Sequence, residues 1–90
     1  MLIALMARDK PGALPIRMEN RPAHVAYLKA SPAVQQAGPL LDDNGDMCGS
    51  LIVLDVADMA EAESWVAGDP YGKAGLFSSV ELIQWNRVIG

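Results

Sequence analysis

The chain has 90 residues, 51% of them hydrophobic, and a formal net charge of −4 with only seven Lys and Arg residues. This length fits one domain over residues 1–90, which buries only about 60–65% of the surface that its unfolded chain exposes. Because phosphate binding requires clustered basic side chains, the acidic balance argues against nucleic acid as a partner. The hydrophobic fraction exceeds the needs of one small core, which predicts that some apolar surface contacts another chain.

Cysteine content and hydropathy give an expected location. Cys48 is the only cysteine, so no disulfide can form within the chain, as in proteins of a reducing compartment. The apolar start, Met1–Ala7, is too short for the core of a signal peptide and lacks a basic leader. No apolar run approaches the roughly 18 residues of a membrane span. We therefore expect a soluble, cytoplasmic protein with no membrane association.

The first half of the chain predicts a strand, a helix and a second strand. Residues Leu2–Ala7 are apolar at odd and even positions alike, as in a strand covered on both faces. After a loop marked by proline and glycine, Arg17–Ala30 has the pattern of a helix. Pro22 either begins the main part of this helix or kinks a longer one. Gly38-Pro39 then opens a short strand, Leu40–Leu41.

The second half predicts a hairpin, a helix and a last strand. Asn44-Gly45 is a strong signal for a hairpin turn, and Ser50–Val56 forms the return strand, again apolar on both faces. A capping box begins the second helix, in which Asp58 caps and Glu61 reaches back. The last strand, Ser79–Ile89, also has apolar side chains on both faces.

The segment from Gly68 to Gly72 ends the second helix and turns the chain toward its last strand. Gly68 is expected in the left-handed conformation common at a helix C-terminus. Pro70 suits the first position of a new helical turn that Asp69 caps. A carboxylate held at such a turn is either a structural cap or one half of a functional site.

The element order indicates a ferredoxin-like α+β sandwich, βαββαβ, with one four-stranded antiparallel sheet and two helices on one side. Two helices cover only one face of the sheet, although three of the four strands are apolar on both faces. The simplest cover for the second face is the same face of another copy. We therefore expect a homodimer with sheet packed on sheet, as in a dimeric α+β barrel.

His24, the only histidine, is the first candidate for chemistry. Neutral imidazole is the usual general base near neutral pH, and Asp69 could orient the ring and stabilise its protonated form. The simpler alternative is that His24 is an ordinary core or surface residue and that Asp69 only caps the turn. One histidine and one aspartate 45 residues apart do not by themselves decide between these readings.

Basic and aromatic side chains near this pair are candidates for substrate binding. Arg8, Arg17 and Arg21 could line an anionic pocket, since guanidinium pairs well with a carboxylate or phenolate. Tyr71 could offer its hydroxyl to a ligand. For each arginine alone the simpler reading is a solvated charge, and for Tyr71 it is packing across the turn.

No cofactor or metal site is expected. One histidine and one cysteine cannot assemble a conventional zinc site, and the acidic run Asp42–Asp46 lacks the Glu and the length of a calcium loop. Cys48 has no histidine nearby in the sequence, which argues against a catalytic thiol.

Three segments resemble the YciI-like (YCII-related) family. Residues 21–28, Arg-Pro-Ala-His-Val-Ala-Tyr-Leu, are similar to the family's helix-1 motif. Ala37-Gly38-Pro39 matches the entry to its second strand, and residues 68–75 match its Asp-Pro-Tyr segment. The three motifs occur in the family's order and span essentially the whole chain. The connection from Gly38 to Ser50 is shorter than in the family, which would reshape one wall of a pocket.

The resemblance implies a fold and a site. The family's chains are ferredoxin-like and dimerise through their sheets, and its site is built from the motif histidine, here His24, and the Asp-Pro-Tyr aspartate, here Asp69. A related member removes chloride from a chlorinated hydroxyquinol, and the wider superfamily includes muconolactone isomerases.

Two hypotheses for function follow. In the first, a cofactor-free enzyme uses His24 and Asp69 for elimination or isomerisation of a small aromatic or carboxylated metabolite. In the second, the same pocket holds a metabolite without converting it, or the chain assists a larger enzyme.

Overall fold

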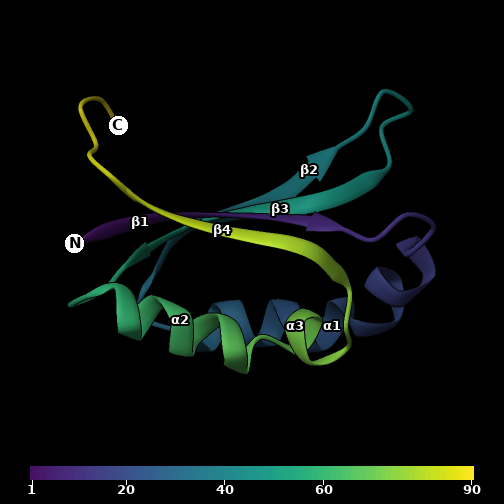
Figure 1. Ribbon diagram of the computed structural model, residues 1–90, viewed down its shortest axis with the longest axis horizontal. Coiled ribbons are helices and arrows are strands. Elements are labelled where there is room, and N and C mark those ends of the chain that lie inside the picture. Colours follow the sequence, from purple (N-terminus) through teal and green to yellow (C-terminus); the bar gives the residue numbers. More distant parts are fainter.

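The computed structural model describes all 90 residues and has the predicted order of strands and helices, with one additional short helix (Figure 1). In chain order the elements are β1 (Leu2–Asp9), α1 (Leu14–Ala30), β2 (Val34–Leu41), β3 (Met47–Asp55), α2 (Met59–Gly68), α3 (Pro70–Lys73) and β4 (Phe77–Trp85).

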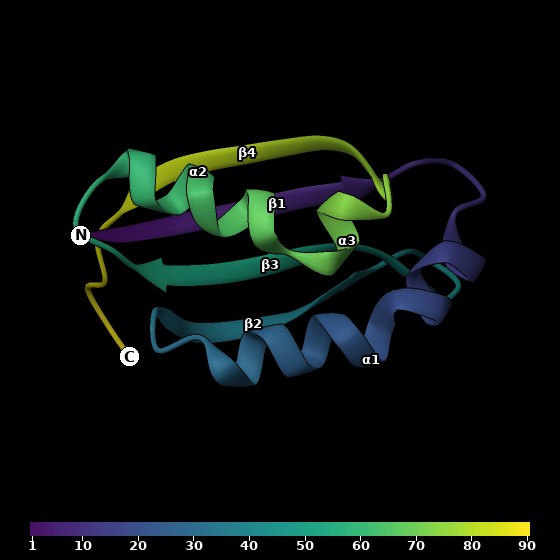
Figure 2. The same ribbon diagram turned by 90° about the horizontal axis from the view of Figure 1, so that it is seen from below.

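The four strands form one antiparallel sheet in the order β2-β3-β1-β4, and the helices lie on one side of it (Figure 1). Seen from the helix side, α1 runs beside the β2 edge while α2 lies over β1 and β4 (Figure 2). This arrangement confirms the predicted ferredoxin-like α+β fold. None of the three helices combines the length and the apolar character that crossing a membrane requires.

The core lies between the sheet and the helices. Odd residues of β1 are paired with even residues of β3 and face the helix layer, where Ile3 is opposite Leu54 and Leu5 is opposite Ile52. Trp65 of α2 packs against this cluster. Alternation along each strand therefore directs half of its side chains into the core.

The opposite face of the sheet has no cover within the chain (Figure 1). Strand alternation places apolar side chains there, and Leu51, Ile83 and Trp85 have exposed fractions of 42%, 52% and 39%. The prediction that β1, β3 and β4 have apolar side chains on both faces is thus confirmed.

The hairpin turn and the capping box are confirmed. Gly45 has the positive φ, +81°, that an Asn-Gly turn requires. At the start of α2, the Asp58 carboxylate accepts a hydrogen bond from the Glu61 backbone N–H at 2.9 Å. The Glu61 side chain reaches back to the backbone N–H of Ala57 at 2.8 Å. The first bond satisfies an unpaired donor of the helix start, while the second reaches the residue before the N-cap.

The predicted element ends needed correction. Helix α1 begins at Leu14 and not at Arg17, because Pro15 in its first turn needs no hydrogen-bond acceptor. Strand β2 covers Val34–Leu41 and not only two residues; as an edge strand it tolerates Pro39. Strand β3 begins at Met47, before the predicted Ser50, and β4 ends at Trp85 before the predicted Ile89.

Gly68 was expected in the left-handed conformation, and this prediction was wrong. The glycines with positive φ are at four other positions. What requires glycine here is space, because a Cβ at Gly68 would lie 2.5 Å from the hydroxyl oxygen of Tyr27. Asp69 and Pro70 behave as predicted: Asp69 is the N-cap of α3, and Pro70 is its first residue.

Candidate active site

One face of α1 provides several residues of the candidate site. Arg17, Arg21 and His24 are spaced four and three residues apart, which places them on the same side of a helix. Arg17 and His24 are the buried residues of α1, although both are polar. Polar side chains on the buried stripe of an amphipathic helix require partners.

The hydrogen-bond partner of His24 is Asp69. The His24 Nδ1 and Asp69 Oδ1 atoms are 2.7 Å apart, with side-chain exposures of 7% and 2%. The same Asp69 oxygen accepts a hydrogen bond from the backbone N–H of Tyr71 at 3.0 Å, as the cap of α3. The predicted pair therefore lies within hydrogen-bond distance.

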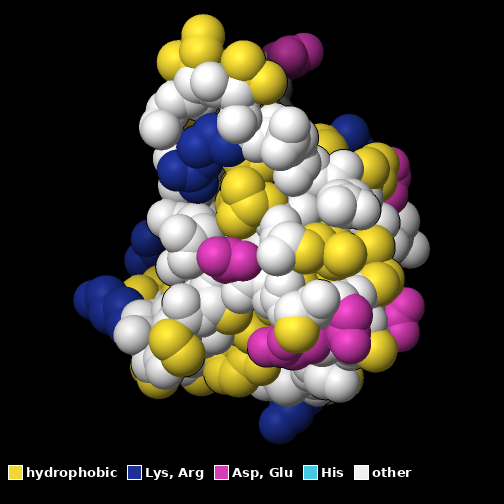
Figure 3. All heavy atoms as spheres, turned by 90° about the vertical axis from the view of Figure 1, so that its left-hand side faces the viewer, with side chains coloured by type: hydrophobic (Ala, Val, Ile, Leu, Met, Phe, Trp, Pro, Cys, Tyr) yellow, Lys and Arg dark blue, Asp and Glu magenta, His cyan; other side chains and the backbone are white.

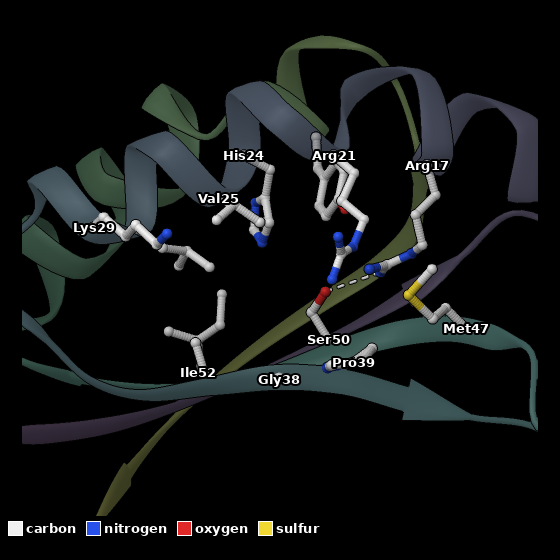
Figure 4. Close-up of a pocket in the computed structure, with 13 residues that line it drawn as sticks. Arg17, Arg21, His24, Val25, Lys29, Gly38, Pro39, Met47, Ser50 and Ile52 are labelled. Atoms are coloured by element: carbon white, nitrogen blue, oxygen red, sulfur yellow. Dashed lines mark hydrogen bonds between the residues drawn. The ribbon is translucent and has the colours of Figure 1, made fainter.

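The contact with Asp69 fixes the roles of the two ring nitrogens. An ionised carboxylate can only accept hydrogen bonds, so Nδ1 carries the proton of the neutral ring and Nε2 keeps its lone pair. Nε2 makes no hydrogen bond within the protein, and no buried side-chain nitrogen or oxygen lacks a partner. Nε2 is therefore accessible, and the ring points into the space below α1 (Figure 4).

That space is a cavity of about 250 Å³ between α1 and the strands β2 and β3. Polar and basic side chains descend from α1, while Ser50, Ile52 and Pro39 line the sheet side (Figure 4). No Asp or Glu is among its 13 lining residues. Arg21 and Lys29 line it without an ion-pair partner. The cavity is therefore suited to a small anion.

Arg17 is held rigidly beside the cavity. Its Nε and Nη2 atoms donate to the two carboxylate oxygens of Asp9, at 2.7 and 3.0 Å, and Nη2 also donates to the Ser50 hydroxyl at 2.9 Å. Burial alone would lower the pKa of Arg17, but the hydrogen bond and the charge of Asp9 raise it above its usual value. Arg17 is a permanent, fixed cation.

Tyr71 packs between these groups. Its ring stacks on the His24 imidazole with centroids 3.8 Å apart and planes inclined by 15°. The Arg17 guanidinium carbon lies 4.6 Å from the centroid of the same ring. Burial raises the pKa of the Tyr71 phenol, although the charges of Arg17 and Arg21 act to lower it. The hydroxyl is therefore protonated at neutral pH.

Not every residue predicted for the site lies there. His24, Asp69, Arg21 and Tyr71 come together, but Arg8 does not line the cavity. Arg8 and the buried Ala7 point to opposite faces of β1, which places Arg8 on the sheet face without helices.

The sequence did not indicate every polar residue that lies at or beside the cavity. Sequence reasoning missed Lys29, Ser50 and the role of Asp9 as the partner of Arg17. Helix spacing could have indicated Lys29, since it lies four residues after Val25, which also lines the cavity. Cys48 is half-buried, donates to the Leu40 carbonyl and is outside this cavity.

The protein groups no three His, Cys, Asp or Glu side chains in a way that could hold a metal ion. On the end of the molecule shown in Figure 3, the Lys and Arg side chains stand apart from one another among apolar and acidic ones.

Comparison with known proteins agrees with the three motifs. The model of the YCII-related domain matches residues 1–86. The chain belongs to this family. The protein YciI of Escherichia coli O6:H1 is 30% identical over 98% of this chain and 99% of its own length.

Solved structures show the same likeness. The 5-chloro-2-hydroxyhydroquinone dehydrochlorinase TftG of Burkholderia phenoliruptrix, solved in complex with 2,5-dihydroxybenzoquinone, superposes with a TM-score of 0.88. It is 37% identical, over 96% of this chain and 94% of its own. The protein PA3566 of Pseudomonas aeruginosa has a TM-score of 0.58 at 18% identity, covering 98% and 93% of the two chains, which shows the fold alone.

Proposed function

We propose that this YCII-related protein is a small enzyme that needs no cofactor and uses His24 and Asp69 for acid–base chemistry on a small anionic metabolite. The observation that carries the proposal is the buried 2.7 Å contact between the two side chains, with the second ring nitrogen free at a cavity. The reaction class that suits it best is elimination or isomerisation, because each needs one group that can take up and return a proton.

The roles of the residues follow from the geometry. His24 Nε2 takes a proton from a substrate carbon or oxygen, and the imidazolium that forms is stabilised by the Asp69 carboxylate at Nδ1. Arg21 binds an anionic carboxylate or phenolate, since its guanidinium has no protein carboxylate to pair with. The Tyr71 hydroxyl donates a hydrogen bond to a substrate oxygen, and Lys29 adds positive charge at the cavity wall.

The likeness to TftG supports this choice of reaction and substrate class. Dehydrochlorination removes a proton and a chloride ion, so it is an elimination of the type that a single base can assist. TftG acts on 5-chloro-2-hydroxyhydroquinone, an aromatic molecule with acidic hydroxyl groups. An aromatic or carboxylated metabolite of similar size would match the cationic cavity of this chain.

The experiment is an activity screen on the purified protein without oxygen, starting with 5-chloro-2-hydroxyhydroquinone and continuing through small phenolic and carboxylated metabolites. Chloride release and absorbance changes report turnover. With an active substrate, His24→Ala is expected to lower kcat by roughly 10²- to 10⁴-fold, the usual contribution of general base catalysis. An unchanged rate in that variant would end the proposal.

A matched pair of arginine variants tests the binding role. Arg21→Met is expected to raise KM, because it removes an unpaired cation from the cavity. Arg8→Met makes the same chemical change on the far face of the sheet and is expected to leave KM unchanged. Equal effects of the two variants would contradict the assignment of Arg21.

Binding without conversion is the alternative outcome of the screen. It would appear as ligand-induced thermal stabilisation with no turnover, by the mass action of binding to the folded state. Loss of that stabilisation in Arg21→Met would then still locate the ligand in the cavity.

We also propose that the chain forms a homodimer through the sheet face that lacks helices. Leu51, Ile83 and Trp85 are exposed on this face, and burying such a surface against its own copy gives a closed two-fold assembly. Sedimentation equilibrium is expected to give a dimer for the natural sequence and a monomer for Leu51→Lys. Met18→Lys, on the outer surface of α1, is the matched control. A stable monomer at micromolar concentration would contradict this assembly.

A further inference from the structure

We propose that Tyr71 is a positioning residue for His24: its ring, held between the Arg17 guanidinium and the His24 imidazole, fixes the plane of the imidazole so that Nε2 faces the cavity. Arg17 and His24 are seven residues apart on one face of α1, a rise of about 10 Å along the helix. The Tyr71 ring fills this interval, 3.8 Å from the imidazole and 4.6 Å from the guanidinium carbon.

The hydrogen bond to Asp69 is not sufficient to fix the imidazole. It restrains one atom, Nδ1, whereas the torsion that rotates a histidine ring has broad minima and little intrinsic preference. Rotation about the Cβ–Cγ bond carries Nδ1 away from Asp69 and Nε2 away from the cavity together, and the single hydrogen bond is the only polar contact that opposes it. A flat ring stacked at 15° on the imidazole face opposes that rotation.

Tyr71 can serve as this support because it is itself held at several points. Its backbone N–H binds Asp69 Oδ1, the same oxygen that contacts His24. Its side chain is 1% exposed, and Phe77 packs against it edge-on at 6.1 Å between centroids. The Arg17 guanidinium behind it is locked by both oxygens of Asp9. Apart from the half-buried Phe77, each residue that holds the ring is buried.

The inference rests on the proposed function in one respect, that Nε2 is the atom that takes the proton. Its test needs no substrate. The chain has one histidine, so ¹⁵N NMR of the neutral imidazole measures the ratio of its two tautomers without ambiguity. In the natural protein the form protonated at Nδ1 is expected to exceed the other by roughly tenfold or more, because of the charged partner at Nδ1.

The decisive variants differ in the ring at position 71. Tyr71→Phe keeps the stack and is expected to keep the tautomer ratio, whereas Tyr71→Leu is expected to lower it by roughly two- to tenfold, since the freed imidazole rotates away from Asp69. Tyr27→Leu removes a tyrosine ring that is not stacked on His24 and is the control for general loss of packing. It is expected to lower stability and leave the ratio unchanged.

Two results would overturn the inference. The first is a folded Tyr71→Leu protein with the natural tautomer ratio, and the second is an equal loss in Tyr71→Phe, which would assign the effect to the hydroxyl. If Tyr71→Leu does not fold, NMR of the Tyr71 ring in the natural protein provides the test. A ring packed on both faces flips slowly, so the two edges of the Tyr71 ring are expected to give separate proton resonances on cooling. Averaged resonances at every accessible temperature would show that the ring is not clamped.

With an active substrate, kinetics add a separate readout. Both variants lose the hydroxyl that the proposed function assigns to the substrate, and Tyr71→Leu is expected to lower kcat further than Tyr71→Phe does, because only Tyr71→Leu also removes the stacked ring. A failed activity screen would remove the proposed function but leave the tautomer result standing, so the two failures are distinguishable.

Discussion

Removing the charge of Arg17 is expected to destabilise the protein severely. Arg17 and Asp9 have side-chain exposures of only 3% and 5%, so Arg17→Met leaves the Asp9 carboxylate buried without a cation. Breaking one side of a buried pair costs about 3–5 kcal/mol, far more than the net contribution of the intact pair. In a domain of this size each 1 kcal/mol corresponds to roughly 4–8 °C in Tm, so the expected loss is at least about 12 °C.

The comparison that tests the reasoning is the double variant Asp9→Leu with Arg17→Met. It replaces the whole pair by apolar side chains of similar length and is expected to be close to the natural stability, because no uncompensated charge remains. The assay is urea and thermal unfolding followed by circular dichroism, at one fixed chain concentration. Asp55→Asn, which removes an exposed partner of the N-terminal amine, is the control and is expected to change stability by about 1 kcal/mol or less.

Two outcomes would refute this account of the buried pair. One is an Arg17→Met protein within about 1 kcal/mol of the natural one, which would mean that water reaches Asp9. The other is a double variant as unstable as the single one, which would mean that packing of the Arg17 stem, and not charge, carries the stability.

Three further predictions concern tyrosine ionisation, glycine packing and the helix cap. Burial raises the pKa of the Tyr27 and Tyr71 hydroxyls above 10.0 in the folded protein. The stability that they contribute is therefore present below pH 10.0 and is lost as pH rises through the raised pKa values. A free energy of unfolding that does not change over the alkaline range would contradict this. Gly68→Ala is expected to cost about 1–3 kcal/mol by overpacking, whereas Gly38→Ala, with open space around it, should lack that steric cost in the same unfolding assay. Asp69→Ala is expected to lower the free energy of unfolding by about 1–2 kcal/mol because it removes the helix cap, and Asp69→Asn is expected to lower it less. Both variants are expected to lower turnover. Full activity in Asp69→Asn would exclude a role for the Asp69 charge beside His24.

The fold was predictable because local signals and global pattern agree. Strands apolar on both faces, the Asn44-Gly45 turn and the Asp58 cap each restrict the chain to the same architecture. The extent of β2 was not predictable, since Gly38-Pro39 weakens a strand in isolation. It is pairing with β3 that keeps this segment extended.

The contact between His24 and Asp69 was predictable, whereas the other residues around the candidate site were not. His24 and Asp69 lie in recognisable sequence motifs. Asp9, the partner of Arg17, lies in β1, whose register the sequence does not specify. Arg8 and Asp9 are adjacent in the sequence, yet alternation sends one to each face of the sheet, and a prediction that is one residue off selects the wrong side chain. The contacts of the Tyr71 ring with His24 and Arg17 require α1 and α3 to meet, which depends on the tertiary fold.

Asp69 Oδ1 holds the start of α3 and the imidazole of His24 at the same time. This double role restricts which substitutions the fold tolerates at position 69. Replacement of Asp69 removes the cap of α3 whether or not the chain catalyses a reaction, so the requirements of the fold alone favour the aspartate. The His24 side chain makes no hydrogen bond to the backbone, so its replacement removes no helix cap and is expected to lower stability less. Under the proposed function, a relative that retains the Asp-Pro-Tyr segment but lacks the histidine would keep the fold without the catalytic base.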